Sequence, residues 1–120
     1  MVKVLLDTNA LLAVFQFKID LEKELDRLLG RYEILVPTSV VKELKGLKSR
    51  YALAALKLSE RYNKVELKGE VDNAILELAK KGNIVVVTND RALRRKLRTN
   101  KIPVIFLRAK THLELAGIIR

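Results

Sequence analysis

Residues 84–87, Ile-Val-Val-Val, form an unbroken run of β-branched apolar side chains. A run of this kind, without polar alternation, is typical of a strand that is buried on both faces, as the strands of parallel sheets are. A second, mostly apolar run at residues 2–6 ends at Asp7 and predicts another buried strand. Three weaker strand patterns lie at residues 33–36, 65–67 and 103–107.

Helical patterns fill the segments between these strands. We expect two helices between residues 10 and 29, broken near 17–20 and stopped by Gly30, and a third that Thr38 or Ser39 caps and that runs to about 47. Further helices are expected at 50–62, 71–81, 90–99 and 111–119. Strands that alternate with helices predict an α/β fold, with a doubly wound, mostly parallel five-stranded sheet flanked by helices. At 120 residues the chain fits one domain spanning 1–120.

The composition limits the function classes. The chain has 24 Lys and Arg against 14 Asp and Glu, a net charge of +10, which favours a polyanionic partner such as a nucleic acid. It has no Cys and one His, which excludes disulfides, thiol catalysis, cysteine zinc sites and paired-histidine catalysis. Abundant Lys, Arg and Glu with a single Gln hint at a thermophilic source.

Apolar segments long enough for a membrane are missing from the sequence. No run approaches the roughly 20 residues that span a bilayer. The run at 2–6 is too short for a signal peptide, and Asp7 interrupts it. We therefore expect a soluble cytoplasmic protein.

Four acidic residues stand at positions where an open parallel sheet places its site. Asp7 and Asp90 follow the first and fourth strands, and sites of such sheets form beyond the carboxyl ends of the strands. Glu43 falls on the flank of an apolar helix face, and Asp72 lies within the inward arc of its helix. Each has an ordinary alternative. Asp7 and Asp90 are good helix N-caps, Glu43 can be a boundary residue, and Asp72 can favour a helix dipole.

The four acids together point to a metal site. Carboxylates gathered in one cleft repel each other unless they are protonated or bridged by cations. Without Cys or clustered His, Mg²⁺ or Mn²⁺ fits these oxygen ligands best, and two such ions can hydrolyse a phosphodiester. Thr8, Asn9, Thr88 and Asn89 flank the acids; they can orient the carboxylates or a bound water, and they are equally ordinary turn residues.

Basic residues close to Glu43 and Asp90 in the sequence are candidates for holding RNA phosphates. For any one of them, a solvated helix face is an equally good explanation. The set consists of Lys42, Lys45, Lys48, Arg91, Arg94, Arg95, Arg98 and Lys101.

The acidic motifs resemble the signature of PIN-domain ribonucleases in its usual order. The pieces are Asp7-Thr8-Asn9, residues 37–44 around Glu43, Asp72 near a helix start, and residues 87–90 ending in Asp90. The resemblance covers essentially the whole chain. It implies a PIN-like fold and metal-dependent hydrolysis of RNA, with the four acids as ligands of Mg²⁺ or Mn²⁺.

Residues 90–107, an Arg- and Lys-rich run followed by Ile-Pro-Val, are similar to stand-alone archaeal PIN proteins. These are related to the nuclease that matures small-subunit ribosomal RNA, so the resemblance implies a role in rRNA processing. Some PIN proteins carry a further acid after the one matched by Asp90. Here Arg91, Arg94 and Arg95 occupy that region, which leaves the number of metal ions open.

Other functions stay open at the level of sequence. A VapC-type toxin ribonuclease shares the fold and binds an antitoxin. A non-catalytic RNA-binding protein of ribosome assembly also fits the charge, although four acids in its phosphate-binding cleft would then serve no purpose without metal. The protein partners left open are a second copy in a homodimer, an antitoxin, or a ribosome-assembly factor. A response-regulator receiver is disfavoured, because Leu107 is followed by Arg108 and not by Lys.

Overall fold

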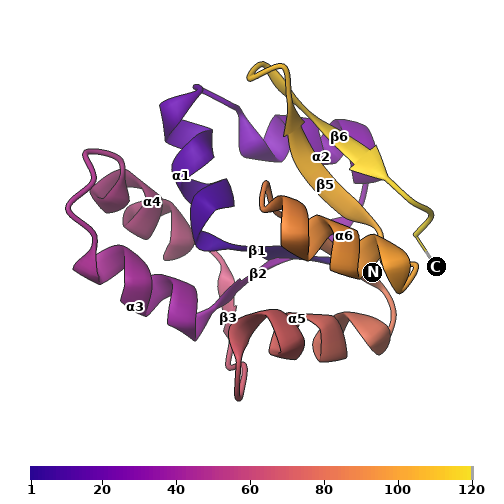
Figure 1. Cartoon of the computed structure of the whole chain (residues 1–120). Coiled ribbons are helices and arrows are strands. Elements are labelled where there is room, and N and C mark those ends of the chain that lie inside the picture. The colour runs from indigo at the N-terminus through magenta and orange to yellow at the C-terminus, as the bar shows by residue number, and fades with distance from the viewer. Residues whose placement is uncertain (120) are drawn as a thin grey trace.

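The computed structural model describes residues 1–119 and has one six-stranded sheet at its centre (Figure 1). Its strands follow the order β3-β2-β1-β4-β5-β6, and β1 to β5 are parallel. The strands are β1 (Val2–Leu6), β2 (Tyr32–Pro37), β3 (Asn63–Val65), β4 (Ile84–Val87), β5 (Val104–Arg108) and β6 (His112–Ala116). The α/β class and the parallel order of the five predicted strands are confirmed.

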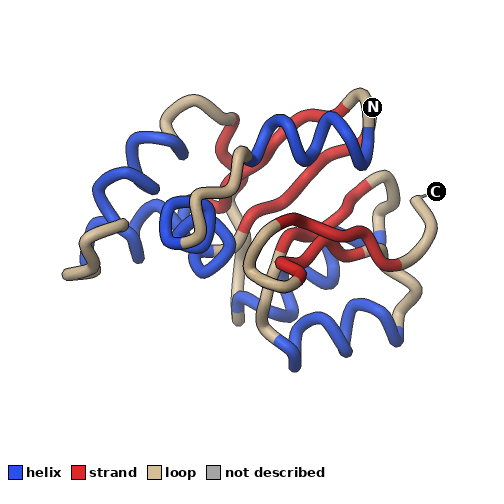
Figure 2. The backbone as a smooth tube through the Cα atoms, turned by 90° about the horizontal axis from the view of Figure 1, so that it is seen from above, coloured by secondary structure: helices blue, strands red, loops and turns tan. Residues whose placement is uncertain are grey.

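Helices cover both faces of this sheet, as the tube view of Figure 2 shows. They are α1 (Thr8–Gln16), α2 (Leu21–Leu29), α3 (Thr38–Gly46), α4 (Ala52–Ser59), α5 (Val71–Lys80) and α6 (Arg91–Thr99). The first four pack into one hydrophobic core, and α5 and α6 pack into a second core on the opposite face. No helix within residues 1–119 is long and apolar enough to cross a membrane.

Successive side chains of the central strands pack alternately into the two cores. In β4, Val85 and Val87 join the core under α1 to α4, whereas Ile84 and Val86 join the core under α5 and α6. A strand with helices on both faces cannot tolerate a polar position, which explains the unbroken apolar run at 84–87.

The chain order places a switch between β1 and β4. From β1 the chain builds outward through β2 and β3, and it then returns to the other side of β1 to add β4, β5 and β6. Helices leave β1 and β4 toward opposite faces, so a crevice opens beyond the carboxyl ends of these two strands. This is where Asp7 and Asp90 lie.

The sixth strand corrects the sequence prediction, which had five strands and a helix over 111–119. Residues 112–116 instead pair antiparallel with β5, from Arg108↔His112 to Val104↔Ala116. Leu113 and Leu115 pack toward the core between more polar neighbours, the alternation of a strand. The turn is formed by Ala109 and Lys110 at φ 53° and 59°, a conformation that Asn or Gly usually signals.

Two smaller predictions were also inaccurate. The short edge strand β3 lies at 63–65, two residues before the predicted position. Helix α3 begins directly after Pro37, and neither Thr38 nor Ser39 caps it, since the N-cap position makes no side-chain hydrogen bond. The proline ends β2 and its fixed φ of −59° leads straight into the helix.

Candidate active site

Asp7 and Asp90 emerge side by side because the strands before them are neighbours. Leu6 of β1 is in register with Val87 of β4. Each aspartate is also the N-cap of the helix that follows: Oδ1 of Asp7 accepts from the Ala10 N–H at 2.8 Å, and Oδ1 of Asp90 accepts from the Leu93 N–H at 3.1 Å. The capping explanation is therefore correct for one oxygen of each carboxylate. It does not account for the meeting of the two acids at one edge.

Glu43 and Asp72 reach the same place from two helices. Glu43, on α3, is exposed and accepts a hydrogen bond of 3.0 Å from Thr8 Oγ1. Asp72 lies half-buried in the first turn of α5. All four acids line one pocket of about 140 Å³, together with Thr8, Asn9, Ser39, Val40, Val71, Ile75 and Leu93.

The acids in this pocket affect one another's protonation. The pKa of Asp7 is raised, first by burial and then by the charges of Asp90 and Asp72, against the lowering effect of hydrogen bonds from Thr88 and Ala10. The pKa of Asp72 is raised by burial and by the charges of Glu70 and Asp90, while Lys96 lowers it. The pocket therefore holds negative charge at a cost that a cation would offset.

The two threonines hold the acids, whereas the two asparagines differ. Thr88 is fully buried; its hydroxyl accepts from the Asp90 N–H at 3.1 Å and acts to lower the pKa of the Asp7 carboxyl. Thr8 holds Glu43 as described above. Asn9 lines the pocket, but Asn89 does not: its Oδ1 accepts from the Leu107 N–H at 2.8 Å and ties the end of β4 to β5.

The donor set fits a hard divalent cation. It consists of carboxylate oxygens without sulfur, and two of the carboxyl groups have a pKa raised by burial and crowding. Within residues 1–119, no three acidic or histidine side chains already stand close enough together to hold an ion.

Comparison with known proteins identifies the family. Residues 4–110 match the family described as "PIN like domain". The chain belongs to this family. Ribonuclease VapC4 of Methanocaldococcus jannaschii is 36% identical to it over 131 residues, with 99% of this chain and 100% of the relative covered. Ribonuclease VapC9 of Archaeoglobus fulgidus is 36% identical over 109 residues, covering 85% and 80%.

A solved structure is similar to this PIN domain over nearly its full length. The structure of the PIN domain endonuclease Utp24 superimposes with a TM-score of 0.82 at 25% sequence identity, covering 98% of this chain and 92% of that one. The fold predicted from the resemblance is therefore confirmed, apart from the additional strand β6.

The basic residues predicted to bind RNA lie in three places in this PIN domain. Arg91, Arg94, Arg95 and Arg98 line one groove beside α6. Lys42, Lys45 and Lys48 are exposed on α3 and directly after it. Lys101 follows the C-terminal end of α6 and is thus separated from Asp90 by the whole helix.

Three residues that line the acidic pocket or act on Asp72 were missed or misread in the sequence. Ser39 was considered only as a cap, yet it lines the pocket, and its Oγ is buried without a hydrogen-bond partner within residues 1–119. Lys96 points toward α5, where it donates to Asn73 Oδ1 and lowers the pKa of Asp72. Glu70 caps α5 by accepting from two backbone N–H groups. In the sequence, the direction of Lys96 was indicated only by its position three residues after Leu93, which places the two side chains on the same side of α6.

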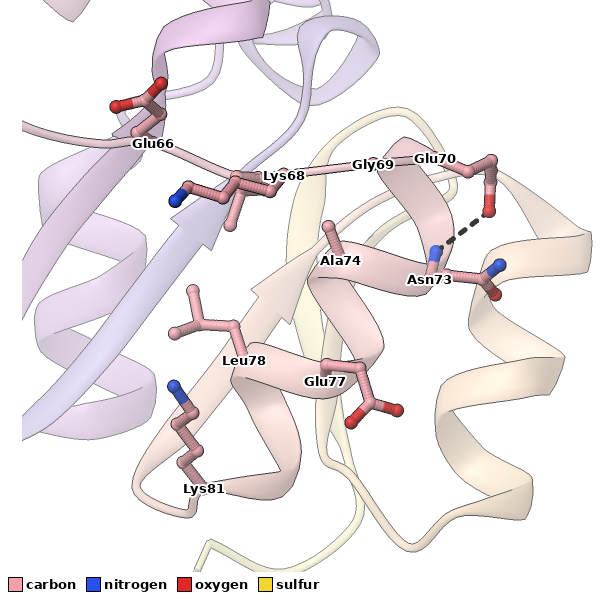
Figure 3. A pocket seen from close by; sticks show the side chains of 10 residues that line it. Glu66, Lys68, Gly69, Glu70, Asn73, Ala74, Glu77, Leu78 and Lys81 are labelled. Atoms are coloured by element: carbon pink, nitrogen blue, oxygen red, sulfur yellow. Dashed lines mark hydrogen bonds between the residues drawn. The ribbon is translucent and has the colours of Figure 1, made fainter.

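A second open pocket lies on the far side of α5 (Figure 3). Its volume is about 370 Å³, and it is lined by the segment before α5 and by one side of that helix. Acidic and basic side chains alternate around it, including Glu66, Lys68, Glu77 and Lys81. None of the four predicted acids lines it, so its size does not make it the candidate active site.

Proposed function

We propose that this chain is a divalent-metal-dependent ribonuclease that hydrolyses phosphodiester bonds at the pocket lined by Asp7, Glu43, Asp72 and Asp90. The observation that carries the proposal is that side chains from two strand ends and two helices share this one pocket in a PIN domain. Two relatives that cover most of the chain are named ribonucleases, which supports RNA as the substrate.

The four carboxylates are the groups that would hold Mg²⁺ or Mn²⁺. When bound, such an ion supplies an acidified water as nucleophile and offsets charge that develops on the phosphate. The chain's own groups position the ligands: the Thr88 hydroxyl accepts from the Asp90 N–H and favours the charged form of Asp7, and the Thr8 hydroxyl holds Glu43. Val40, Ile75 and Leu93 form the apolar part of the pocket wall.

Two cellular roles are compatible with this activity in the cytoplasm. The identity of 36% to two proteins named VapC supports a toxin that binds an antitoxin. The likeness to Utp24, together with the pattern of residues 90–107, supports a stand-alone nuclease of rRNA processing. Co-purification with the product of an adjacent reading frame, and inhibition by it, would select the toxin role.

Cleavage assays with a matched pair of variants test the proposal. Structured and single-stranded RNA are incubated with the purified chain in Mn²⁺, in Mg²⁺ or in EDTA. Asp7→Asn keeps a capping oxygen but loses a charged ligand, so cleavage should fall about a hundredfold or more. Asp20→Asn is the control, because Asp20 caps α2 in the same way, through Oδ1 and the Lys23 N–H at 3.2 Å, and does not line the acidic pocket.

The results separate the alternatives. Metal-dependent cleavage that survives in Asp20→Asn and is lost in Asp7→Asn supports the proposal. Equal cleavage by both variants would remove Asp7 from the mechanism. A wild-type chain that binds RNA and is inert with every metal would favour the non-catalytic RNA-binding protein.

A further inference from the structure

The side of α6 that faces the β5–β6 hairpin carries a groove of about 330 Å³. Figure 1 shows α6 lying across the strands at this point. Four arginines of the helix line the groove together with two small apolar residues: Arg91, Arg94, Arg95, Arg98, Val104 and Ala116. The groove is distinct from the acidic pocket, which shares none of these residues.

In the part of the chain that the structure describes, these arginines have no acidic partners. Among residues 1–119, the ion pairs of arginine involve Arg27, Arg61 and Arg108 and none of the four in the groove. Four guanidinium groups on one face of a nine-residue helix repel one another. An anion in the groove would relieve that repulsion, and arginine binds phosphate oxygens with paired hydrogen bonds.

Two of the arginines are held in place by the protein itself. The guanidinium of Arg94 lies 3.9 Å from the centre of the Phe106 ring. Nη1 of Arg98 donates to the Ile102 carbonyl at 3.2 Å. Gly117, at φ 100°, leaves room for this side chain, since a Cβ there would lie 2.3 Å from Arg98 Nη1. Ordered side chains lose less entropy on binding, which favours a binding surface over a merely solvated face.

The linings of the groove and of the acidic pocket include adjacent residues of the chain. Asp90 caps α6, and Arg91 is the first residue of that helix. The nine residues of α6 extend about 13 Å, so Arg91 and Arg98 mark the near and far ends of a track only a few nucleotides long.

We propose that this groove binds the backbone of a single RNA strand over the few nucleotides on one side of the cleaved bond. The inference rests on the proposed function, which supplies the cleaved bond at the acidic pocket. The Arg94–Phe106 stack also offers a flat cationic face on which an unpaired base can lie. An acidic protein segment would bind the same arginines. Such a partner would not explain why the groove begins next to the acidic pocket.

Binding measured without catalysis tests the inference. Fluorescence anisotropy in EDTA follows a short single-stranded RNA bound to the wild-type chain and to an Arg94→Gln/Arg98→Gln variant at several salt concentrations. Loss of two phosphate contacts should reduce the slope of log K against log[salt] by about 1.4 and weaken affinity at least about tenfold at low salt. An Arg31→Gln/Lys57→Gln variant removes the same charge from exposed positions outside the groove and should keep the wild-type slope.

A second measurement tests the one-sided track. RNA substrates are shortened stepwise from the 5′ end in one series and from the 3′ end in another, and their cleavage is measured in Mn²⁺. The wild type should lose cleavage after the removal of far fewer nucleotides in one series than in the other. The arginine variant should be insensitive to shortening in that series. The inference is overturned if the Arg94→Gln/Arg98→Gln and Arg31→Gln/Lys57→Gln variants show equal slopes of log K against log[salt]. It is also overturned if the Arg94→Gln/Arg98→Gln variant binds RNA as the wild type does but binds an acidic peptide more weakly. RNA binding as expected, without any cleavage, would count against the proposed function alone.

Discussion

Replacing Thr88 by Val tests how the site holds its acids. The change keeps the shape of the side chain and removes a fully buried hydroxyl that serves both Asp7 and the Asp90 N–H. A bond to a neutral backbone group contributes about 1 kcal/mol and one to a carboxylate about 1.5–3, so we expect a loss of roughly 2–4 kcal/mol. Urea unfolding of the metal-free protein at pH 7 measures this loss.

The same substitution at Thr8 is the matched control. Its hydroxyl donates to Glu43, which is exposed and can turn to water instead, so Thr8→Val should cost less than about 1 kcal/mol. Equal losses for the two variants would refute the reasoning. Such a result would mean that the buried Thr88 hydroxyl contributes no more to the free energy of unfolding than a hydrogen bond at the surface does.

Three further predictions concern stability. Ser39→Ala should raise the free energy of unfolding by about 0.5–1 kcal/mol, because its buried hydroxyl has no hydrogen-bond partner within residues 1–119. Ser59→Ala should lower it by about 1 kcal/mol, because that buried hydroxyl donates to the Leu56 carbonyl at 2.6 Å, and two losses of equal size would contradict this. The raised pKa of Asp7 means that the folded protein takes up a proton more readily than the unfolded chain. In urea unfolding across pH, the metal-free protein should therefore gain stability from this residue as the pH falls toward 3.8, and Asp7→Asn should remove that gain. The pKa of Glu24 is lowered, first by its hydrogen bond with Arg27 and further by the backbone N–H that β6 donates to it. Its contribution should be present above pH 4.5 and disappear as the pH falls through the lowered value, and a Glu24→Gln variant with an unchanged acid limb would disprove it.

The parts of the fold that could be predicted from the sequence are those fixed by burial. The run at 84–87 is apolar throughout because two cores meet on β4, and Val4, Leu5 and Leu6 before Asp7 are buried in the same way. Acids directly after such strands must lie at the carboxyl edge of the sheet, whatever the helices do. The positions of Asp7 and Asp90 therefore follow from the apolar runs that precede them.

The helical acids were harder to place. A helical wheel gives the direction of a side chain and not its depth. It put Asp72 in an inward arc, where it is half-buried, and Glu43 on a flank, where it is exposed. Both line the pocket although α3 and α5 pack on opposite faces of the sheet, an arrangement set by contacts far apart in the sequence.

The remaining features depend on contacts that no local pattern reveals. Strand β6 was missed because its turn uses Ala109 and Lys110 in a conformation that these residues rarely adopt. Asn89 resembles its neighbours in the motif, yet it binds the backbone of β5. The ordering of Arg94 requires Phe106, twelve residues further along the chain, to lie beneath it.

Metal-dependent melting of the wild type and Asp7→Asn tests the central claim most directly. A cation that binds only the folded acidic pocket stabilises the protein by mass action, so Mn²⁺ should raise the wild-type melting temperature progressively with concentration. Metal-free Asp7→Asn should melt at or above the wild type, because one of the crowded charges is gone, and its response to Mn²⁺ should be much smaller. Asp20→Asn should respond as the wild type does. If Mn²⁺ shifts all three proteins equally, or shifts none of them, the four acids do not form a metal site.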